Sequence, residues 1–258
     1  MTTPLSKVNT AYWTKRSESY GKQHFAELTD LNASKWDSYL TKVFKKANGT
    51  LTKAVDIGTG PGFLAILLAK KGLEVDAVDM NPAMLKKARE NAEKLGANIT
   101  TKQMNALDLD YEDDSLDLVV SRNLTWNLED PEAAYKEWLR VLRPGGLLIN
   151  FDANWYNYLY DKEAKEAYRN DRKRVANEGA YDFYIHTDVS RMEEIAKHLP
   201  LSAKQRPHWD FTILKELLPH SSHLTVTKNI NHSVLTKEQE LNFNATPLFS
   251  IIARKGME

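Results

Sequence analysis

The chain has 258 residues, of which 42% are apolar and 27% are charged, and its 35 basic side chains are balanced by 35 acidic ones. This balance excludes the strongly basic composition of a dedicated nucleic-acid binder, although it leaves a local basic groove open. The sequence contains no cysteine, which excludes disulfides, thiolate metal sites and cysteine nucleophiles.

The N-terminus and the apolar runs indicate a soluble protein. The first ten residues lack the basic and then apolar pattern of a secretory signal. The longest apolar run, Phe63 to Ala69, is far shorter than the roughly 20 residues needed to span a bilayer. We therefore expect a cytoplasmic protein with no membrane insertion.

Short β-type runs alternate with amphipathic helical segments between residues 50 and 152. Asn81 as N-cap, followed by Pro82, begins the second helix, and Asp130-Pro131 begins the third. The predicted strands are Lys53–Ile57, Glu74–Asp79, Asn98–Met104, Leu116–Ser121 and Leu147–Phe151, and the helices between them are Phe63–Lys71, Pro82–Leu95 and Pro131–Leu142. Strands separated by such helices indicate right-handed crossovers and a parallel sheet covered on both faces.

Two further strands are predicted near the C-terminus, Leu224–Ile230 and Leu248–Arg254, and a polar loop joins them. The sequence shows no internal repeat, no low-complexity tract and no Pro/Gly/Ser-rich linker. We therefore expect a single α/β domain over residues 1–258.

The most informative stretch is V-D-I-G-T-G-P-G-F at residues 55–63, where the first strand turns into the first helix. Glycines let a ligand approach the backbone there, and the following helix offers free N–H groups. Asp79 ends the next strand, where a carboxylate can accept hydrogen bonds from both hydroxyls of a ribose. The pattern therefore indicates a nucleoside-containing ligand. It does not favour NAD, because the dinucleotide pattern needs a glycine at the position of Phe63.

The chain carries four motifs of one known family in the family's order. They are V-D-I-G-T-G-P-G-F at 55–63, V-D-A-V-D-M-N-P at 75–82, D-L-V-V-S-R-N at 117–123 and V-L-R-P-G-G at 141–146. With these motifs it resembles the class I S-adenosylmethionine (SAM) dependent methyltransferases of the small-molecule type. The resemblance implies a seven-stranded, mostly parallel, doubly wound sheet. It also implies a core over 50–152 and 209–258, an N-terminal helical lid over 1–49 and a helical cap insertion over 153–208.

The resemblance implies SAM as the cofactor and assigns it a site. Asp56 and the three glycines would lie under its methionine part, Asp79 on its ribose and Met80 against its adenine. Asn123 matches the position whose backbone faces the methionine amino group. The implied cofactor residues are Tyr20, Asp56, Gly58, Gly60, Gly62, Asp79, Met80, Asn105, Ala106 and Asn123.

Two parts of this implied site need comment. Asn105-Ala106 stands where the family has an aspartate and a small residue near the adenine amino group, and an amide oxygen can still accept a hydrogen bond there. Residues 11–20 look like the helix that closes over SAM, with Tyr20 as its contact and Arg16 facing the SAM carboxylate. The alternative is a surface helix that only buries its aromatic residues in the core.

Residues that select the methyl acceptor are expected in the cap and beside it. The segment 153–208 is rich in aromatic residues, which with nearby carboxylates could hold a cation or a flat heterocycle. The alternative for any one ring is that it packs the cap onto the sheet. The predicted acceptor contacts are Trp126, Asn154, Trp155 and Tyr184.

Methyl transfer from a sulfonium is an in-line displacement, so orientation contributes much of the rate. A base is needed only for an acceptor that arrives protonated. Asp152 is the main candidate, because it follows the fifth strand at the carboxyl edge of the sheet, where open α/β folds place ligands. His186 and His208 are two further candidates. No metal site is expected, because no third ligand stands at a fixed spacing from a histidine pair.

The sequence thus predicts a SAM-dependent methyltransferase that acts on a small-molecule acceptor and releases S-adenosylhomocysteine (SAH). Two alternatives stay open: a methyltransferase that acts on protein or RNA, and a SAM- or SAH-binding protein without catalysis. The lack of cysteine excludes the covalent route of cytosine C5 methylation and the cysteine-trap route of arsenite methylation. The basic residues between 162 and 174 alternate with acidic ones, which is typical of a solvated helix face.

Overall fold

The structure, a computed structural model, describes residues 5–45 and 50–257. Two parts of the predicted lid, residues 1–4 and 46–49, therefore lie outside the described residues. Residue 258 also lies outside them. The strands are β1 (Lys53–Ile57), β2 (Glu74–Asp79), β3 (Thr100–Gln103), β4 (Leu116–Arg122), β5 (Leu142–Asp152), β6 (His223–Thr227) and β7 (Phe249–Arg254).

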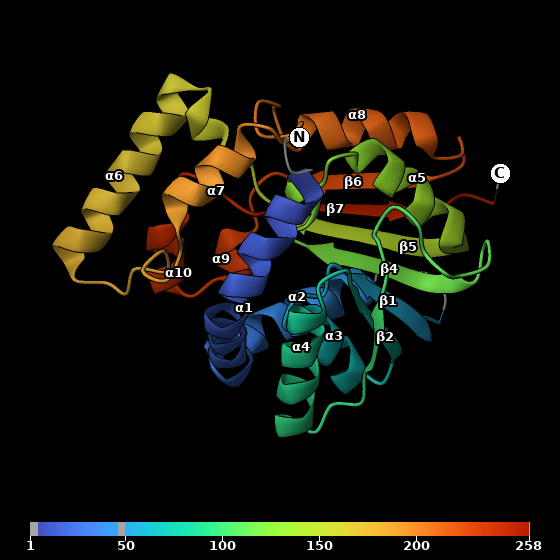
Figure 1. Ribbon diagram of the computed structural model, residues 1–258. Helices are drawn as coiled ribbons and strands as arrows, with labels where there is room; N and C mark the ends of the chain where they lie inside the picture. The colour runs from blue at the N-terminus through green and yellow to red at the C-terminus, as the bar shows by residue number, and fades with distance from the viewer. Residues whose placement is uncertain (1–4, 46–49, 258) are drawn as a thin grey trace.

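These strands form one sheet in the order β3-β2-β1-β4-β5-β7-β6 (Figure 1). β1 to β5 pair in parallel, whereas β7 is antiparallel to both of its neighbours. The predicted α/β class and the mostly parallel seven-stranded sheet are confirmed. β5 begins five residues before the predicted Leu147, because the stretch predicted as a turn continues the strand beyond an irregularity in its pairing with β4.

Helices cover both faces of the sheet and form two separate apolar clusters with it. Those on one face are α2 (Leu31–Lys45), α3 (Phe63–Lys70) and α4 (Pro82–Lys94), and those on the other are α5 (Pro131–Val141) and α8 (His208–Leu217). The predicted helix starts are confirmed: Asn81 and Asp130 accept hydrogen bonds from the backbone N–H groups of Ala83 and Ala133, and a proline follows each cap. These two helices therefore begin where the sequence predicts.

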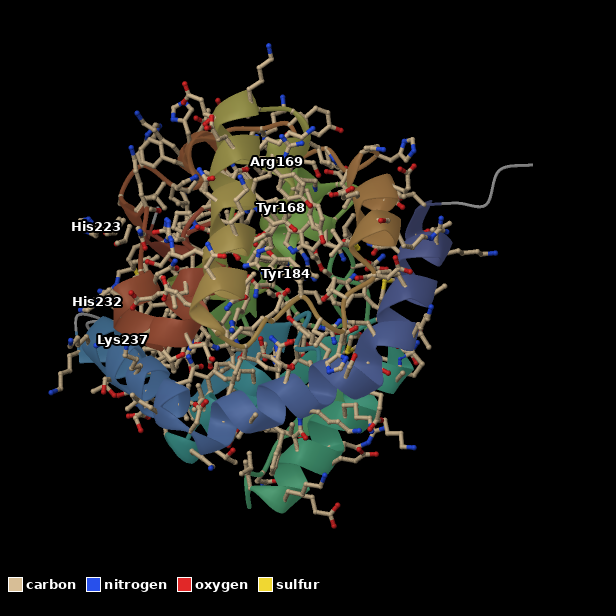
Figure 2. The ribbon with its side chains drawn as sticks, turned by 90° about the vertical axis from the view of Figure 1, so that its left-hand side faces the viewer. Tyr168, Arg169, Tyr184, His223, His232 and Lys237 are labelled. Carbon is tan, nitrogen blue, oxygen red and sulfur yellow. The ribbon has the colours of Figure 1, made fainter. Side chains whose placement is uncertain are left out.

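The long N-terminal helix α1 (Leu5–Thr29) passes the carboxyl ends of β1 and β4. It packs on α4 and on α7 (Val189–Ala196), and its side chains line cavities together with the loops that follow the two strands. Figure 2 shows α1 running between α4 below and the α6–α7 region above. This placement makes α1 a shared wall between the core and the rest of the molecule.

A helical cap is built from two separate segments of the chain. The first holds η2 (Asn157–Leu159), α6 (Lys162–Glu178) and α7, and the second, between β6 and β7, holds α9 (Asn231–Val234) and α10 (Lys237–Asn242). Arg172 of α6 joins the two, because its Nη2 donates to the backbone carbonyl oxygen of Asn242 over 2.8 Å. In Figure 1 these helices gather beyond one end of the strands.

The second cap segment differs from the polar loop predicted between the last two strands. β6 ends at Thr227, three residues before the predicted end, and two short helices follow. Thr236 and Gln239 form a capping box that starts α10. Asn231 closes the segment, because its side chain accepts from the N–H of Leu248 (2.8 Å) and donates to the carbonyl oxygen of Phe243 (3.0 Å). Side-chain capping thus gives a polar sequence a fixed structure.

Candidate active site

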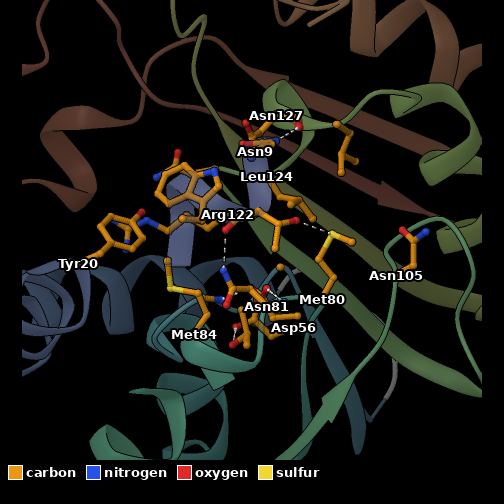
Figure 3. Close-up of a pocket in the computed structure, with 18 of the residues that line it drawn as sticks. Asn9, Tyr20, Asp56, Met80, Asn81, Met84, Asn105, Arg122, Leu124 and Asn127 are labelled. Atoms are coloured by element: carbon orange, nitrogen blue, oxygen red, sulfur yellow. Dashed lines mark hydrogen bonds between the residues drawn. The ribbon is translucent and has the colours of Figure 1, made fainter. Parts of the chain in front are cut away.

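The turn between β1 and α3 forms one side of a cavity of about 220 Å³, here called the loop cavity, which the end of β2, the end of β4 and α1 complete. Gly58 has a φ of +66°, and a Cβ there would lie 2.6 Å from the side chain of Leu124, so this position requires glycine. A Cβ on Gly60 would instead point toward Tyr20, with its nearest atom 3.8 Å away. Because Gly60 has no side chain, its backbone itself lines the loop cavity. Figure 3 shows other residues that line this cavity, among them Tyr20, Asp56 and Met80.

Asp79 connects the glycine turn to the loop that follows β2. Its Oδ2 accepts a hydrogen bond from the N–H of Gly60 over 2.9 Å, and its Oδ1 accepts one from the N–H of Asn81 over 2.8 Å. Burial raises the pKa of Asp79 to about 6. Because each carboxylate oxygen has further lone pairs, Asp79 can accept from a ligand while it holds the two loops.

Asp56 holds the glycine turn from below. Its Oδ2 accepts hydrogen bonds from the hydroxyl of Thr59 (2.7 Å) and from the N–H of Ala65 (3.0 Å) in the first turn of α3. Burial raises the pKa of Asp56 to about 7. Its carboxyl group therefore fixes the start of α3 and also lines the loop cavity.

Most of the cofactor residues implied by the sequence line the loop cavity. They are Tyr20, Asp56, Gly58, Gly60, Asp79, Met80, Asn105 and Asn123. Asn105 already uses its amide oxygen to accept from the backbone two residues on. Gly62 and Ala106 do not line the cavity: Gly62 packs on Ala88 of α4, and the carbonyl oxygen of Ala106 accepts from the indole of Trp138. Those two residues therefore pack behind the residues that line the cavity.

A second cavity of about 130 Å³, here called the cap cavity, lies between α1 and the cap. It shares five wall residues with the loop cavity: Trp13, Tyr20, His24, Arg122 and Asn123. The rest of its wall is largely aromatic and includes Tyr12, Trp126, Trp155, Tyr156, Tyr158, Phe183, Tyr184 and Phe243. The two cavities therefore meet at one set of side chains.

Three of the four predicted acceptor contacts, Trp126, Trp155 and Tyr184, line the cap cavity. Asn154 lines neither cavity, because it begins the turn into η2, where its carbonyl oxygen accepts from the N–H of Asn157 over 3.3 Å. Lining the cavity and packing the cap are not exclusive roles. Tyr184 meets Tyr168 of α6 edge-on, with ring centroids 6.0 Å apart (Figure 2).

Asp152, the main predicted candidate for the base, lines neither cavity. The residue is 0% exposed, and its Oδ2 accepts from Nη1 of Arg206 (2.7 Å) and from the N–H of Trp126 (3.0 Å). Arg206 also pairs with Asp210 over 2.6 Å. The strand end does carry Asp152 to the predicted edge, but an arginine from the distant segment before α8 occupies its carboxylate.

His186 and His208 also lie outside both cavities. His186 is exposed on an outer groove beside α1 and α10, and His208 is exposed as the first residue of α8. Neither is placed to reach a ligand in the cap cavity. In the part of the chain that the structure describes, no three His, Asp or Glu side chains group as a metal site would.

His24 of α1 is the titratable residue that sequence reasoning missed. It is 5% exposed, it belongs to the wall shared by the two cavities, and its Nδ1 has no hydrogen-bond partner among the described residues. Burial, followed by the charges of Arg122 and Arg16, lowers the pKa of His24 well below its usual value. The sequence signal was its position four residues after Tyr20, which puts both rings on one helix face; their centroids are 4.2 Å apart.

Arg122 and Asn123 bring the end of β4 to the shared wall. Both Nη atoms of Arg122 lie 3.3 Å from Oε2 of Glu27. Asn123 has a φ of +57°, in the left-handed region that asparagine adopts more readily than most non-glycine residues. Its backbone carbonyl and its side-chain oxygen accept from the indoles of Trp126 (3.0 Å) and Trp155 (3.3 Å). The end of β4 thus positions two aromatic walls of the cap cavity.

Comparisons with known proteins address the same region. A family model described as a methyltransferase domain matches residues 55–150. Demethylmenaquinone methyltransferase from Thermus thermophilus is 37% identical over 99 residues, which cover 38% of this chain and 45% of that protein. The chain spans less than half the length of this relative and of uncharacterized relatives from Haemophilus influenzae and Mycobacterium bovis.

Solved structures share the fold. A protein from Methanococcus maripaludis superposes with a TM-score of 0.56 at 22% identity and covers 92% of this chain and 93% of its own. Phosphoethanolamine N-methyltransferase 2 from Haemonchus contortus, in complex with S-adenosyl-L-methionine, gives a TM-score of 0.58 at 18% identity and covers 86% and 53%. At such identities the likeness bears on the fold alone.

The sheet order, the glycine turn and the acidic residue that ends β2 define an α/β domain for a nucleoside-containing cofactor. The match of residues 55–150 to a methyltransferase domain agrees with a site of this kind. SAM, the cofactor that the motifs imply, fits the loop cavity, whose wall includes the carboxylate of Asp79 and the backbone of Gly58 and Gly60. None of the described helices has the length and apolarity needed to cross a membrane.

Proposed function

We propose that this protein transfers a methyl group from SAM to a small-molecule acceptor and releases SAH. SAM would bind in the loop cavity and the acceptor in the cap cavity. The proposal depends above all on the five residues that line both cavities. Because a ligand in either cavity would contact these residues, the two ligands would lie close together. Such proximity supplies much of the rate of an in-line displacement.

SAM supplies an electrophilic methyl group: a lone pair of the acceptor forms the new bond to carbon, and the electron pair of the breaking C–S bond stays on sulfur. The residues of the chain bind and orient the two reactants. Asp79 accepts from the ribose hydroxyls, and Met80 covers the adenine side of the loop cavity. Tyr20 of α1 stands at the shared wall, where it separates the cofactor from solvent.

We assign to His24 the role of the base that takes the proton from an acceptor that arrives as an alcohol, phenol or ammonium. It belongs to the shared wall, and its Nδ1 is without a partner among the described residues. Because burial and two arginines lower its pKa, the imidazole is neutral at ordinary pH and has a lone pair available. Asp152, in contrast, is already paired with Arg206.

The form of the cap cavity supports a small acceptor. Its wall is largely aromatic and is closed on one side by α1 and on the other by the cap segments 153–207 and 228–248, as is typical of sites for small apolar ligands. The Thermus thermophilus relative is named for a small-molecule acceptor, demethylmenaquinone. We therefore assign selection of the acceptor to the two cap segments.

Titration calorimetry and an SAH-release assay test the proposal. SAM and SAH should bind and NAD should not, and SAH should be released with at least one member of a broad panel of small acceptors. Binding of SAM without SAH release across the panel would favour a non-catalytic SAM-binding protein. Release of SAH only with protein or RNA substrates would overturn the small-molecule assignment.

A pair of variants separates the two cavities. Tyr184→Ala removes a ring from the cap cavity, whereas Tyr181→Ala removes an exposed ring three residues away that lines only the outer groove. We expect Tyr184→Ala to raise the KM of the acceptor about tenfold or more and to leave SAM affinity unchanged. Tyr181→Ala should change neither. Equal effects of both variants would mean that the cap cavity does not bind the acceptor.

A further inference from the structure

Arg16 of α1 presents a buried positive charge to the cap cavity. It is 8% exposed and lines that cavity but not the loop cavity. Its guanidinium donates to three neutral acceptors: the hydroxyl of Ser19 (2.5 Å), the amide oxygen of Gln23 (3.3 Å) and the hydroxyl of Thr187 (3.3 Å). Arginine has five N–H donors, so two are left for a ligand.

No carboxylate among the described residues lies within ion-pairing distance of Arg16. The acidic residue of the cap cavity, Glu27, is paired with Arg122 over 3.3 Å. Asp188, next to Thr187 in the chain, is exposed and uses its side chain to cap α7. The charged wall residues of the cap cavity are therefore two arginines and one glutamate, which leaves one positive charge in excess.

An uncompensated charge in an aromatic enclosure is costly. A ligand that carries a negative charge would remove this cost, whereas a cationic ligand would increase it. The guanidinium carbon of Arg16 lies 5.4 Å from the ring centroid of Tyr20, so an anion bound to Arg16 would sit close to the shared wall. The planar guanidinium favours a planar oxyanion such as a carboxylate.

We propose that the acceptor is a small aromatic acid whose carboxylate pairs with Arg16 while its ring lies among the aromatic walls of the cap cavity. The inference rests on the proposed function, since it names the substrate class of the same cavity. Arg16 then determines specificity by holding the carboxylate end of the acceptor. The sequence assigned Arg16 to the SAM carboxylate, but the cavity it lines is the one beside the cap.

The test compares acids with their uncharged analogues. Benzoate, a hydroxybenzoate and an indole carboxylate, each beside its carboxamide, are titrated into the protein saturated with SAH. We expect the wild type to bind at least one acid about 10- to 100-fold more tightly than its amide, the usual contribution of a hydrogen bond to a charged group. No preference for the acid in any of the three pairs would overturn the proposal.

Variants of Arg16 assign that preference to one side chain. Arg16→Gln should abolish the preference for the acid, and Arg16→Lys should keep part of it. Lys15→Gln makes the same charge change one residue away, at an exposed position outside the cap cavity, and should keep the full preference. If Arg16→Gln retains the preference, or Lys15→Gln loses it equally, Arg16 is not the anchor.

SAM affinity and turnover distinguish this proposal from its neighbours. SAM should bind Arg16→Gln within about twofold of the wild type, which also shows that the variant is folded; a tenfold loss would place Arg16 on the cofactor and overturn the inference. If the wild type binds aromatic acids through Arg16 but never releases SAH, the substrate-class inference survives as ligand recognition and the proposed methyl transfer fails.

Discussion

The loop cavity takes its shape from the backbone, whereas the cap cavity takes its shape from side chains. The loop cavity depends on a turn that only glycine can form and on one carboxylate that ties two loops together. The cap cavity is assembled from rings on α1, on the end of β4 and on both cap segments. One site is encoded in a short stretch of sequence, and the other depends on contacts between distant parts of the chain.

The charges of the two cavities also differ. The loop cavity contains Asp56, Asp79 and Glu129 against Arg122, and the pKa values of Asp56 and Asp79 are raised to about 7 and about 6. The cap cavity contains the same Arg122 together with Arg16, against Glu27. An acidic cavity suits ribose hydroxyls and a cationic sulfonium, and a basic cavity suits an anionic acceptor. Under the proposed function, this contrast matches SAM to the loop cavity and the anionic acceptor to the cap cavity, and it disfavours exchange of the two ligands.

The largest expected effect is the loss of stability when the two buried ion pairs of Arg206 are removed. Arg206→Met would leave two buried carboxylates, Asp152 and Asp210, without their partner, so the free energy of unfolding should fall by about 3–5 kcal/mol. Arg174→Met is the control, because Arg174 is 42% exposed and lies 3.8 Å from Asp171; its loss should cost less than about 1 kcal/mol. Chemical denaturation measures both.

Asp152→Asn asks whether the same network has a catalytic role. Because its carboxylate lies outside both cavities, the substitution should lower stability while SAM affinity stays unchanged. A variant of wild-type stability that binds SAM and has lost turnover would instead return Asp152 to the reaction, and with it the role predicted from its place at the strand end.

The fate of Asp152 illustrates how much the sequence could predict. Its place at the carboxyl edge follows from a local strand pattern, as do the helix starts at Asn81 and Asp130. Its partner does not, since Arg206 lies 54 residues further along the chain. The same limit explains α9, whose Val234 carbonyl accepts from the side chain of Asn32: a polar stretch becomes ordered through a contact that no local pattern contains.

His24 connects the two cavities, so its substitution tests whether they work together. His24→Asn should lower kcat about 100-fold, a typical contribution of general base catalysis, and leave SAM affinity within a few-fold. His186→Asn and His208→Asn are matched controls at exposed positions outside both cavities and should have normal kcat. Equal losses in all three would point to a general effect of histidine removal.

The pH profile adds a second measure of His24. Its pKa is lowered well below the usual value by burial, Arg122 and Arg16, so the base stays neutral as the pH falls through the ordinary histidine range. We therefore expect kcat to show no histidine-type decrease near neutral pH and to decrease only at more acidic pH. A decrease with the ordinary histidine pKa would assign the proton to another group.

Gly58, which lines the loop cavity, and Gly72, which does not, separate the effect of the cavity's shape from that of backbone strain. Gly58→Ala should lower SAM affinity about 30-fold, or about 2 kcal/mol. The new Cβ would lie only 2.6 Å from the side chain of Leu124, so that side chain would have to move. Gly72→Ala has the same kind of positive φ, +88°, but its Cβ would meet nothing within 4 Å, so it should lower stability by about 1–2 kcal/mol and spare SAM binding. Calorimetry and thermal unfolding distinguish these results. Similar SAM affinities for the two variants would mean that the turn tolerates a shift of Leu124.

The smallest effect concerns the charge of Asp79. Its pKa in the free protein is raised to about 6, so above that pH the ionised carboxylate can accept from the ribose, and as the pH falls through it the added proton removes an acceptor. SAM affinity should therefore fall about tenfold between pH 7 and pH 5, because below its pKa the carboxyl of the free protein must release its proton when SAM binds. Asp79→Asn should bind SAM more weakly at every pH and lose this dependence.

Asp56→Asn is the matched control for the pH experiment. The Asp56 carboxyl also has a raised pKa, about 7, but its Oδ2 is already held by Thr59 and Ala65. The variant should therefore retain the decrease in SAM affinity near pH 6. If instead Asp56→Asn removes the decrease and Asp79→Asn keeps it, the titrating group lies beneath the glycine turn, and the ribose contact assigned to the end of β2 is wrong. The loop cavity would then recognise SAM through the glycine turn alone. Its acidic side chains would serve to hold the backbone and would not contact the cofactor.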